Sequence, residues 1–136
     1  MANLFSWSDS YSVGIPEIDE QHKKFFVLLN NLGEAMSSGV GKEAVDNTLA
    51  GVVNYTVVHF SYEESQMAKC SYPGYLQHKK LHDEFAAHAK ELLANARASK
   101  SVVSIEVMLA LRTWLLDHIL KADKLYAPCI NRQKAA

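Results

Sequence analysis

Apolar side chains recur every three to four residues in four stretches of this chain, which is the spacing of one face of an α-helix. Polar side chains fill the positions between them, so each stretch predicts an amphipathic helix with one buried face. The predicted helices cover residues 17–38, 42–68, 74–96 and 102–126. Short connections favour antiparallel neighbours, so the pattern predicts an all-α, up-down-up-down four-helix bundle, with residues 1–136 as a single domain.

Local signals mark the ends of these helices. Pro16 suits a first helical turn, because its missing N–H would have no intrahelical partner there. A Ser-Ser-Gly sequence at 37–39 and Pro73-Gly74 predict turns, and Pro128 is expected to end the fourth helix. Residues 1–16 carry aromatic and aliphatic side chains without helical spacing, which predicts an extended N-terminal arm packed along the body.

Composition sets broad limits on function. The chain has 136 residues, of which 49% are apolar and 21% charged, as in ordinary globular domains. A formal net charge of -1 gives no electrostatic footprint for nucleic acid or for an anionic membrane surface. No apolar run approaches the roughly 20 residues of a membrane span, and the N-terminus lacks a signal-peptide pattern. We therefore expect a cytoplasmic protein without a membrane span.

Two pairs of candidate metal ligands lie at helical spacing near the middle of the chain. His59 and Glu63 are four residues apart on the second predicted helix, and His78 and His82 are four apart on the third. Residues four apart project from the same face of a helix. Both pairs also continue the apolar stripes of their helices, so they are expected to face the interior of the bundle.

The bundle topology brings further ligands to the same place. His22 lies near the start of the first predicted helix, and His118 and Asp123 lie near the end of the fourth. In an antiparallel bundle all these positions are at one end. Five residue steps from His118 to Asp123 turn a regular helix by about 140°, so a π-bulge is expected to bring Asp123 inward.

These histidines and carboxylates predict a buried metal site. Burying several imidazoles and carboxylates without partners costs several kcal/mol per unpaired charge, on the order of the whole stability of a domain. Imidazole with carboxylate favours iron, zinc, copper or manganese. The His-Glu-x-x-His motif of zinc hydrolases is absent, because Lys79, Lys80 and Leu81 separate the third-helix histidines. The Glu-x-x-His motif of glutamate-rich di-iron bundles is absent as well.

Seven residues together resemble the complete ligand set of the hemerythrins, in the single-domain bacterial form of that family: His22, His59, Glu63, His78, His82, His118 and Asp123. The likeness extends from Trp7 in the arm to Tyr126. It implies two iron ions (Fe²⁺/Fe³⁺) with a bridging oxo or hydroxo group. In the family pattern His78, His82 and His118 hold one iron. His22 and His59 hold the other, and Glu63 and Asp123 bridge the two.

The implied ligand count has a functional consequence. Five imidazoles, two bridging carboxylates and one bridging oxygen leave a single coordination position open on a pair of roughly octahedral iron ions. The resemblance implies reversible binding of dioxygen at that position, for oxygen storage, transport or delivery. We expect a monomer that is not an enzyme, with dioxygen as its partner and no protein recipient evident from the sequence. Two alternatives stay open: a di-iron oxidase or peroxidase, and an oxygen or iron sensor or iron-storage protein.

Other residues have weaker assignments. His88 is six positions after His82 and is expected at the surface or rim. Apolar residues near the ligands are expected to exclude water and external protons from the site: Phe26, Leu29, Tyr55, Phe60, Phe85, Leu111 and Trp114. Tyr126, three residues after Asp123, is expected close to the metal without an assigned role. Cys70 and Cys129 lack C-x-x-C spacing and are expected to be buried or idle thiols.

Overall fold

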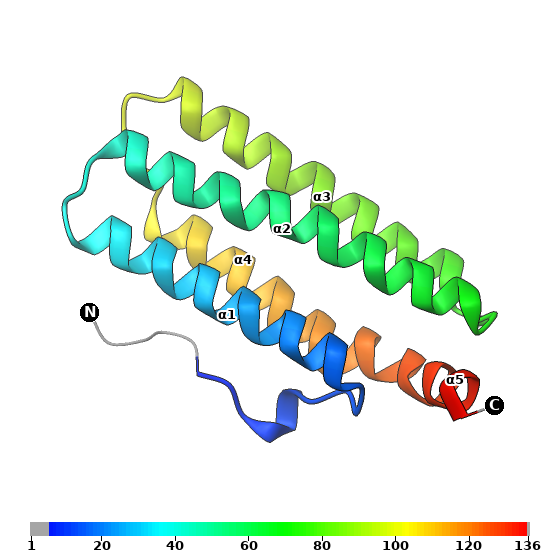
Figure 1. Cartoon of the computed structure of the whole chain (residues 1–136). Coiled ribbons are helices and arrows are strands. Elements are labelled where there is room, and N and C mark those ends of the chain that lie inside the picture. The colour runs from blue at the N-terminus through cyan, green and yellow to red at the C-terminus, as the bar shows by residue number, and fades with distance from the viewer. Residues whose placement is uncertain (1–5, 136) are drawn as a thin grey trace.

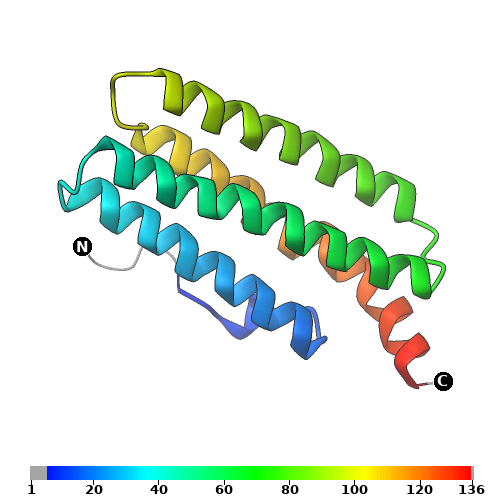
Figure 2. The ribbon, with the colours of Figure 1, turned by 45° about the horizontal axis from the view of Figure 1, so that its top comes forward.

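Antiparallel helices form the body of the protein, as the computed structural model in Figure 1 shows. The structure describes residues 6–135. The four long helices are α1 (Pro16–Ser37), α2 (Lys42–Lys69), α3 (Tyr75–Ala98) and α4 (Ile105–His118). They alternate in direction, and the turned view of Figure 2 agrees with this arrangement. The predicted all-α, up-down-up-down bundle is confirmed.

A continuous apolar core fills the space between the helices. Its members occupy the stripes that the three- and four-residue spacing predicts, and they include Phe25, Leu29, Leu49, Val53, Phe85 and Leu111. Burying one such side chain contributes about 1.5–3 kcal/mol relative to leaving it exposed. A second apolar cluster closes the end where α1 begins and α2 ends: Val13, Ile15, Ile18, Met67, Tyr126, Ala127 and Ile130.

The N-terminal arm packs along the body, and it contains one short helical turn. Residues 1–5 of the predicted arm lie outside the described residues. A 3-10 turn, η1 (Asp9–Tyr11), interrupts the extended path. The ring of Tyr11 meets that of Phe26 edge-on with 5.2 Å between centroids, and the ring of Trp7 is 5.7 Å from Phe26. The arm therefore packs against α1 through the ring of Phe26.

The turn between α2 and α3 has a defined capping geometry. Cys70 follows the last residue of α2, and Ser71 adopts a left-handed conformation with φ of 55°. The Tyr72 N–H donates to the Met67 carbonyl oxygen at 3.0 Å, and the Ser71 N–H donates to that of Ala68 at 3.1 Å. These two hydrogen bonds form a Schellman motif. They hold Cys70 in a fixed position at the end of α2.

The last helical region differs from the prediction at Pro128. We expected this proline to end the fourth helix, but the chain passes through a π-helical turn, η2 (Ile119–Asp123), into α5 (Lys124–Ala135), which contains Pro128. Proline removes one backbone hydrogen bond from a helix. Burial of Ala127 and Ile130 in the second cluster offsets this loss, because helix stability in proteins comes mostly from tertiary packing.

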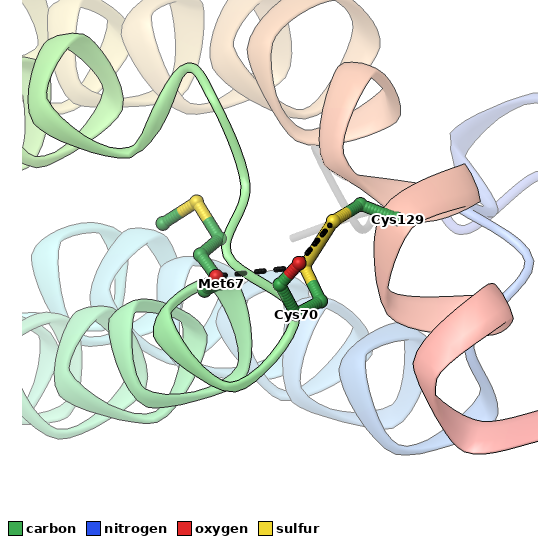
Figure 3. The surroundings of a disulfide bond; sticks show 3 residues. All are labelled: Met67, Cys70 and Cys129. Carbon is green, nitrogen blue, oxygen red and sulfur yellow. Dashed lines mark hydrogen bonds between the residues drawn. A yellow bond between two sulfur atoms is a disulfide. The ribbon is translucent and has the colours of Figure 1, made fainter. Parts of the chain in front are cut away.

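The two cysteines form a disulfide, and the expectation of idle thiols is wrong (Figure 3). Cys70 at the end of α2 and Cys129 in α5 have Cα atoms 5.8 Å apart, a usual separation for a disulfide. They are 59 residues apart in sequence, so no short spacing motif indicates that they pair. The bundle topology brings them together at the end that holds the second apolar cluster.

No helix within residues 6–135 is long and apolar enough to cross a membrane.

Candidate metal centre

All seven candidate ligands lie at one end of the bundle interior. This is the end where α1 and α3 begin and where α2 and α4 finish, on the right in Figure 1. Each of the seven side chains is buried: His22, His59, Glu63, His78, His82, His118 and Asp123. The antiparallel topology therefore brings together the residues that the sequence singled out.

Four of these residues form a first group around the ends of α1 and α2. The Nε2 atom of His22 lies 3.1 Å from Oδ2 of Asp123 and 3.8 Å from Oε2 of Glu63. The Nε2 atom of His59 lies 3.1 Å from Oε1 of Glu63. The imidazole rings of His22 and His59 meet edge-on with centroids 4.8 Å apart. Two nitrogens and two carboxylates thus face a common point.

A second group contains the other three histidines. The Nε2 atom of His118 lies 3.0 Å from that of His78 and 3.1 Å from that of His82. Oδ1 of Asp123 lies 2.9 Å from the same His118 atom and 3.1 Å from Nε2 of His78. Oε1 of Glu63 lies 3.3 Å from Nε2 of His82. Three imidazole nitrogens therefore converge with two carboxylate oxygens.

Glu63 and Asp123 belong to both groups. Within each group the ligand atoms lie within 4.8 Å of one another. The two oxygens of Asp123 face different groups, since Oδ2 approaches His22 and Oδ1 approaches His118. This arrangement fits two neighbouring metal subsites that share two carboxylates, one subsite with three imidazoles and the other with two.

The π-helical turn supplies Asp123 to the site. A regular helix would point residues 118 and 123 in different directions, whereas a π-helix closes hydrogen bonds between residues five apart. The π segment runs from Ile119 to Asp123, directly after His118. The predicted local widening of the helix is confirmed, and it places both side chains at the same group.

Several ligand atoms lack hydrogen-bond partners within the described part of the chain, although they are buried. These atoms are both ring nitrogens of His22, Oε1 of Glu63, and both carboxylate oxygens of Asp123. Apart from Nδ1 of His22, these atoms approach other ligand atoms closely but are not aligned for hydrogen bonds. Buried polar atoms are normally satisfied. Unsatisfied nitrogen and oxygen atoms directed at a common point fit a bound cation.

The electrostatics of the ligand cluster favour protonated imidazole beside ionised carboxylates. Burial lowers the pKa of the His22 imidazole, but the carboxylates of Asp123 and Glu63 outweigh it and raise that pKa to about 9. Burial raises the pKa of Glu63, but the charge of His59 and the other imidazoles outweighs it and holds the pKa well below its usual range. The carboxylates therefore stay ionised and attract a positive charge, either a proton on imidazole or a metal ion.

The pKa of His22 predicts how the stability of the iron-free protein depends on pH. The folded-state pKa of about 9 lies above the ordinary value of 6.5. Protonated His22 therefore contributes stability that is complete below pH 6.5 and is lost as the pH rises through 9. The expected loss of unfolding free energy is about 3 kcal/mol, measured by denaturant titration of iron-free protein. A flat profile across this window, or the same loss in His22→Gln, would contradict the assignment.

Three residues that the sequence did not assign orient the ligands. The amide oxygen of Gln21 lies 2.6 Å from Nδ1 of His59. Oε2 of Glu64 lies 2.9 Å from Nδ1 of His82. Such partners leave Nε2 free to bind metal and fix the orientation of the ring. The Tyr126 hydroxyl donates a hydrogen bond to Oε2 of Glu63, which gives this tyrosine a role that the sequence left open.

Aromatic side chains enclose the histidines on the side of the bundle interior. The ring of Phe60 stacks on that of His82 with centroids 3.7 Å apart, and Trp114 stacks on His118 at 4.5 Å. An apolar cavity begins about one helical turn from the ligands; among the residues that line it are Phe25, Leu29, Thr56, Phe85 and Leu111. The exposed position of His88 agrees with its assignment to the surface. The centre is therefore closed to solvent largely by apolar groups.

Comparisons with known proteins point to one family. Residues 13–130 match the family described as Hemerythrin HHE cation binding domain. The chain is 30% identical over 129 residues to a bacteriohemerythrin of Methylococcus capsulatus, covering 94% of this chain and 98% of that protein. It is 35% identical over 124 residues to a bacteriohemerythrin of Stenotrophomonas maltophilia, covering 91% of this chain and 80% of the other. A crystal structure of wild-type hemerythrin superposes with a TM-score of 0.87 at 30% identity, covering 93% of this chain and 98% of that one.

Proposed function

The chain belongs to the hemerythrin family, and on this premise we propose that it binds dioxygen reversibly at a pair of iron ions, for oxygen storage, transport or delivery. The observation that carries the proposal is the pair of overlapping ligand groups that share Glu63 and Asp123. A site for one metal ion would not require two carboxylates that each belong to both ligand groups. The buried, imidazole-rich donor set fits iron as one of the metals that imidazole and carboxylate favour, and the names of the relatives support iron and oxygen.

The proposed ligand roles follow the two groups. One iron is held by His78, His82 and His118. The other is held by His22 and His59. Glu63 and Asp123 belong to both groups and would be shared by the two irons. An iron pair held in this way would supply electrons to dioxygen and recover them when the gas leaves.

The protein's own contribution is to position the ligands and exclude water. Gln21 and Glu64 hold the imidazoles of His59 and His82, and the Tyr126 hydroxyl holds Glu63. The phenyl rings of Phe25 and Phe60 contact the imidazole rings of His59 and His82, one in each ligand group. Neither aromatic ring can give or take a proton, so both favour the return of unchanged dioxygen over further chemistry. We therefore propose a carrier and not an enzyme.

Oxygen cycling tests this function directly. Iron-loaded protein is reduced without oxygen, its iron content is measured, and oxygen is then admitted and removed repeatedly while the absorption spectrum is recorded. We expect two irons per chain and a charge-transfer band that appears with oxygen and disappears without it over many cycles. Irreversible oxidation at the first exposure would contradict the carrier function and favour an oxidase or a sensor.

A further inference from the structure

The Cys70–Cys129 disulfide joins the end of α2, the helix that carries Glu63, to α5, the helix that directly follows Asp123. Cys70 caps α2, two helical turns after Glu63, and Cys129 lies in α5, which follows Asp123 directly. We propose that this disulfide is a reversible redox-modification site: reduction by a low-molecular-weight thiol releases α5 from the end of α2 and loosens the hold of Tyr126 on Glu63. This inference goes beyond oxygen binding and applies to whichever metal occupies the centre.

Tyr126 connects the disulfide to the metal centre. It lies one helical turn before Cys129 and is fully buried. Its hydroxyl donates to Oε2 of Glu63, and its ring centroid is 5.4 Å from that of His78. A displacement of α5 away from α2 therefore acts first on the orientation of Glu63, a residue shared by both ligand groups.

The other polar ties of α5 run to the arm and to α1. The Lys124 ammonium donates to the Ser10 carbonyl oxygen at 2.7 Å, the Asn131 amide donates to that of Gly14 at 3.4 Å, and Lys134 pairs with Glu17 at 2.8 Å. All three contacts are exposed and contribute little. Against α2, the described contacts of α5 besides the disulfide are the Tyr126 hydrogen bond and apolar packing around Met67. Reduction thus leaves the apolar packing in place but removes the covalent tie, which predicts local loosening and not global unfolding.

The two cysteines differ in exposure, and each sulfur atom has a backbone carbonyl oxygen nearby. Cys70 is half-buried, whereas Cys129 is only 8% exposed, so Cys70 is the more accessible residue and the one at which we expect an external thiolate to attack. Sγ of Cys70 lies 3.4 Å from the Met67 carbonyl oxygen, and Sγ of Cys129 lies 3.1 Å from the Cys70 carbonyl oxygen (Figure 3). A disulfide sulfur has no proton to donate, but each thiol would donate to the oxygen already in place. The thiol protons therefore find acceptors on reduction, but a thiol donates only a weak hydrogen bond and replaces the covalent tie between α5 and α2 only in part.

The exchange is balanced with glutathione as the thiol. A glutathione thiolate attacks Sγ of Cys70, the disulfide breaks, and Cys129 leaves with the electron pair and takes up a proton. A second glutathione thiolate attacks the glutathione sulfur of the mixed disulfide and releases Cys70, which is also protonated. Two electrons and two protons pass to the protein, and glutathione disulfide forms. The reverse exchange restores the cross-link. In a reducing compartment disulfides are usually transient and sense redox state.

Thiol trapping tests the reversibility of the pair. Purified protein is equilibrated in buffers with graded ratios of reduced to oxidised glutathione, alkylated, and weighed by intact mass spectrometry. We expect two populations, with no or two alkyl groups, whose ratio follows the buffer and is the same from either direction. A pair that stays fully oxidised in every buffer would overturn the proposal and make the disulfide purely structural.

Amide hydrogen exchange tests the link to the metal centre. Reduced wild type and Cys70→Ser/Cys129→Ser are each compared with the oxidised protein, with and without iron. At labelling times too short for global unfolding, we expect exchange across residues 124–135 to accelerate at least about fivefold while α1 is unchanged, and iron to pass faster to an external chelator. The control Lys134→Ala, which removes the exposed tie to Glu17, should change neither. Equal exchange in oxidised and reduced protein, or acceleration throughout the bundle at these short times, would overturn the local linkage. Amide exchange of the iron-free protein does not depend on the proposed function, so it tests the linkage even if the protein does not bind oxygen.

Discussion

His118→Ala is expected to reduce the iron content from the proposed two ions per chain to one or fewer. The His118 Nε2 atom is central to its group, with Asp123, His78 and His82 all within 3.1 Å. Alanine removes one of three imidazoles from that subsite and leaves Asp123 without the neighbour at 2.9 Å. Loss of a ligand weakens metal binding steeply, because fewer donor atoms then coordinate the ion. Iron is measured by elemental analysis after desalting.

His88→Ala is the matched control for this substitution. His88 lies on α3 with two of the candidate ligands but is exposed at the surface. It should retain the full iron content and the same absorption spectrum as the wild type. Wild-type iron content in His118→Ala, or loss of iron in His88→Ala, would mean that the ligands have been assigned to the wrong helix faces.

Cys129→Ser is expected to lower the unfolding free energy of the iron-free protein by about 4 kcal/mol, the loop-closure value for a disulfide that spans 59 residues. The cross-link lowers the conformational entropy of the unfolded chain, and its removal restores that entropy. Denaturant titration measures the difference. Wild type in excess reductant should show the same loss, while the variant should not respond to reductant. A loss below about 1 kcal/mol would mean that the disulfide does not restrict the unfolded chain.

The bundle could be predicted from the sequence because its signal is periodic. The stripe through Leu49, Thr56 and His59 continues for several turns, so it outweighs the β-branched and aromatic residues around Tyr55 that would suit a strand. Pro128 misled the prediction because a local rule about proline does not include tertiary packing. Ile130 and Cys129 hold α5 against α2, and the helix continues past the proline.

The candidate ligands could be predicted because two pairs each lie on one helix, and the helix order brings these pairs together with His22, His118 and Asp123. The partners of these ligands could not be predicted in the same way. Gln21 reaches His59 across 38 residues and Glu64 reaches His82 across 18, so each contact depends on how two helices face each other. The Cys70–Cys129 disulfide depends in the same way on the contact of α2 with α5. Only a three-dimensional structure supplies those pairings.

Anomalous X-ray diffraction at the iron edge, from crystals of the iron-loaded protein, tests the two-metal centre most directly. We expect two peaks at the end of the bundle where the ligand groups converge, one beside His78, His82 and His118. The second peak should lie beside His22 and His59, with a carboxylate oxygen of Glu63 and of Asp123 bound to each ion. A single peak, or two ions that share neither carboxylate, would contradict the account.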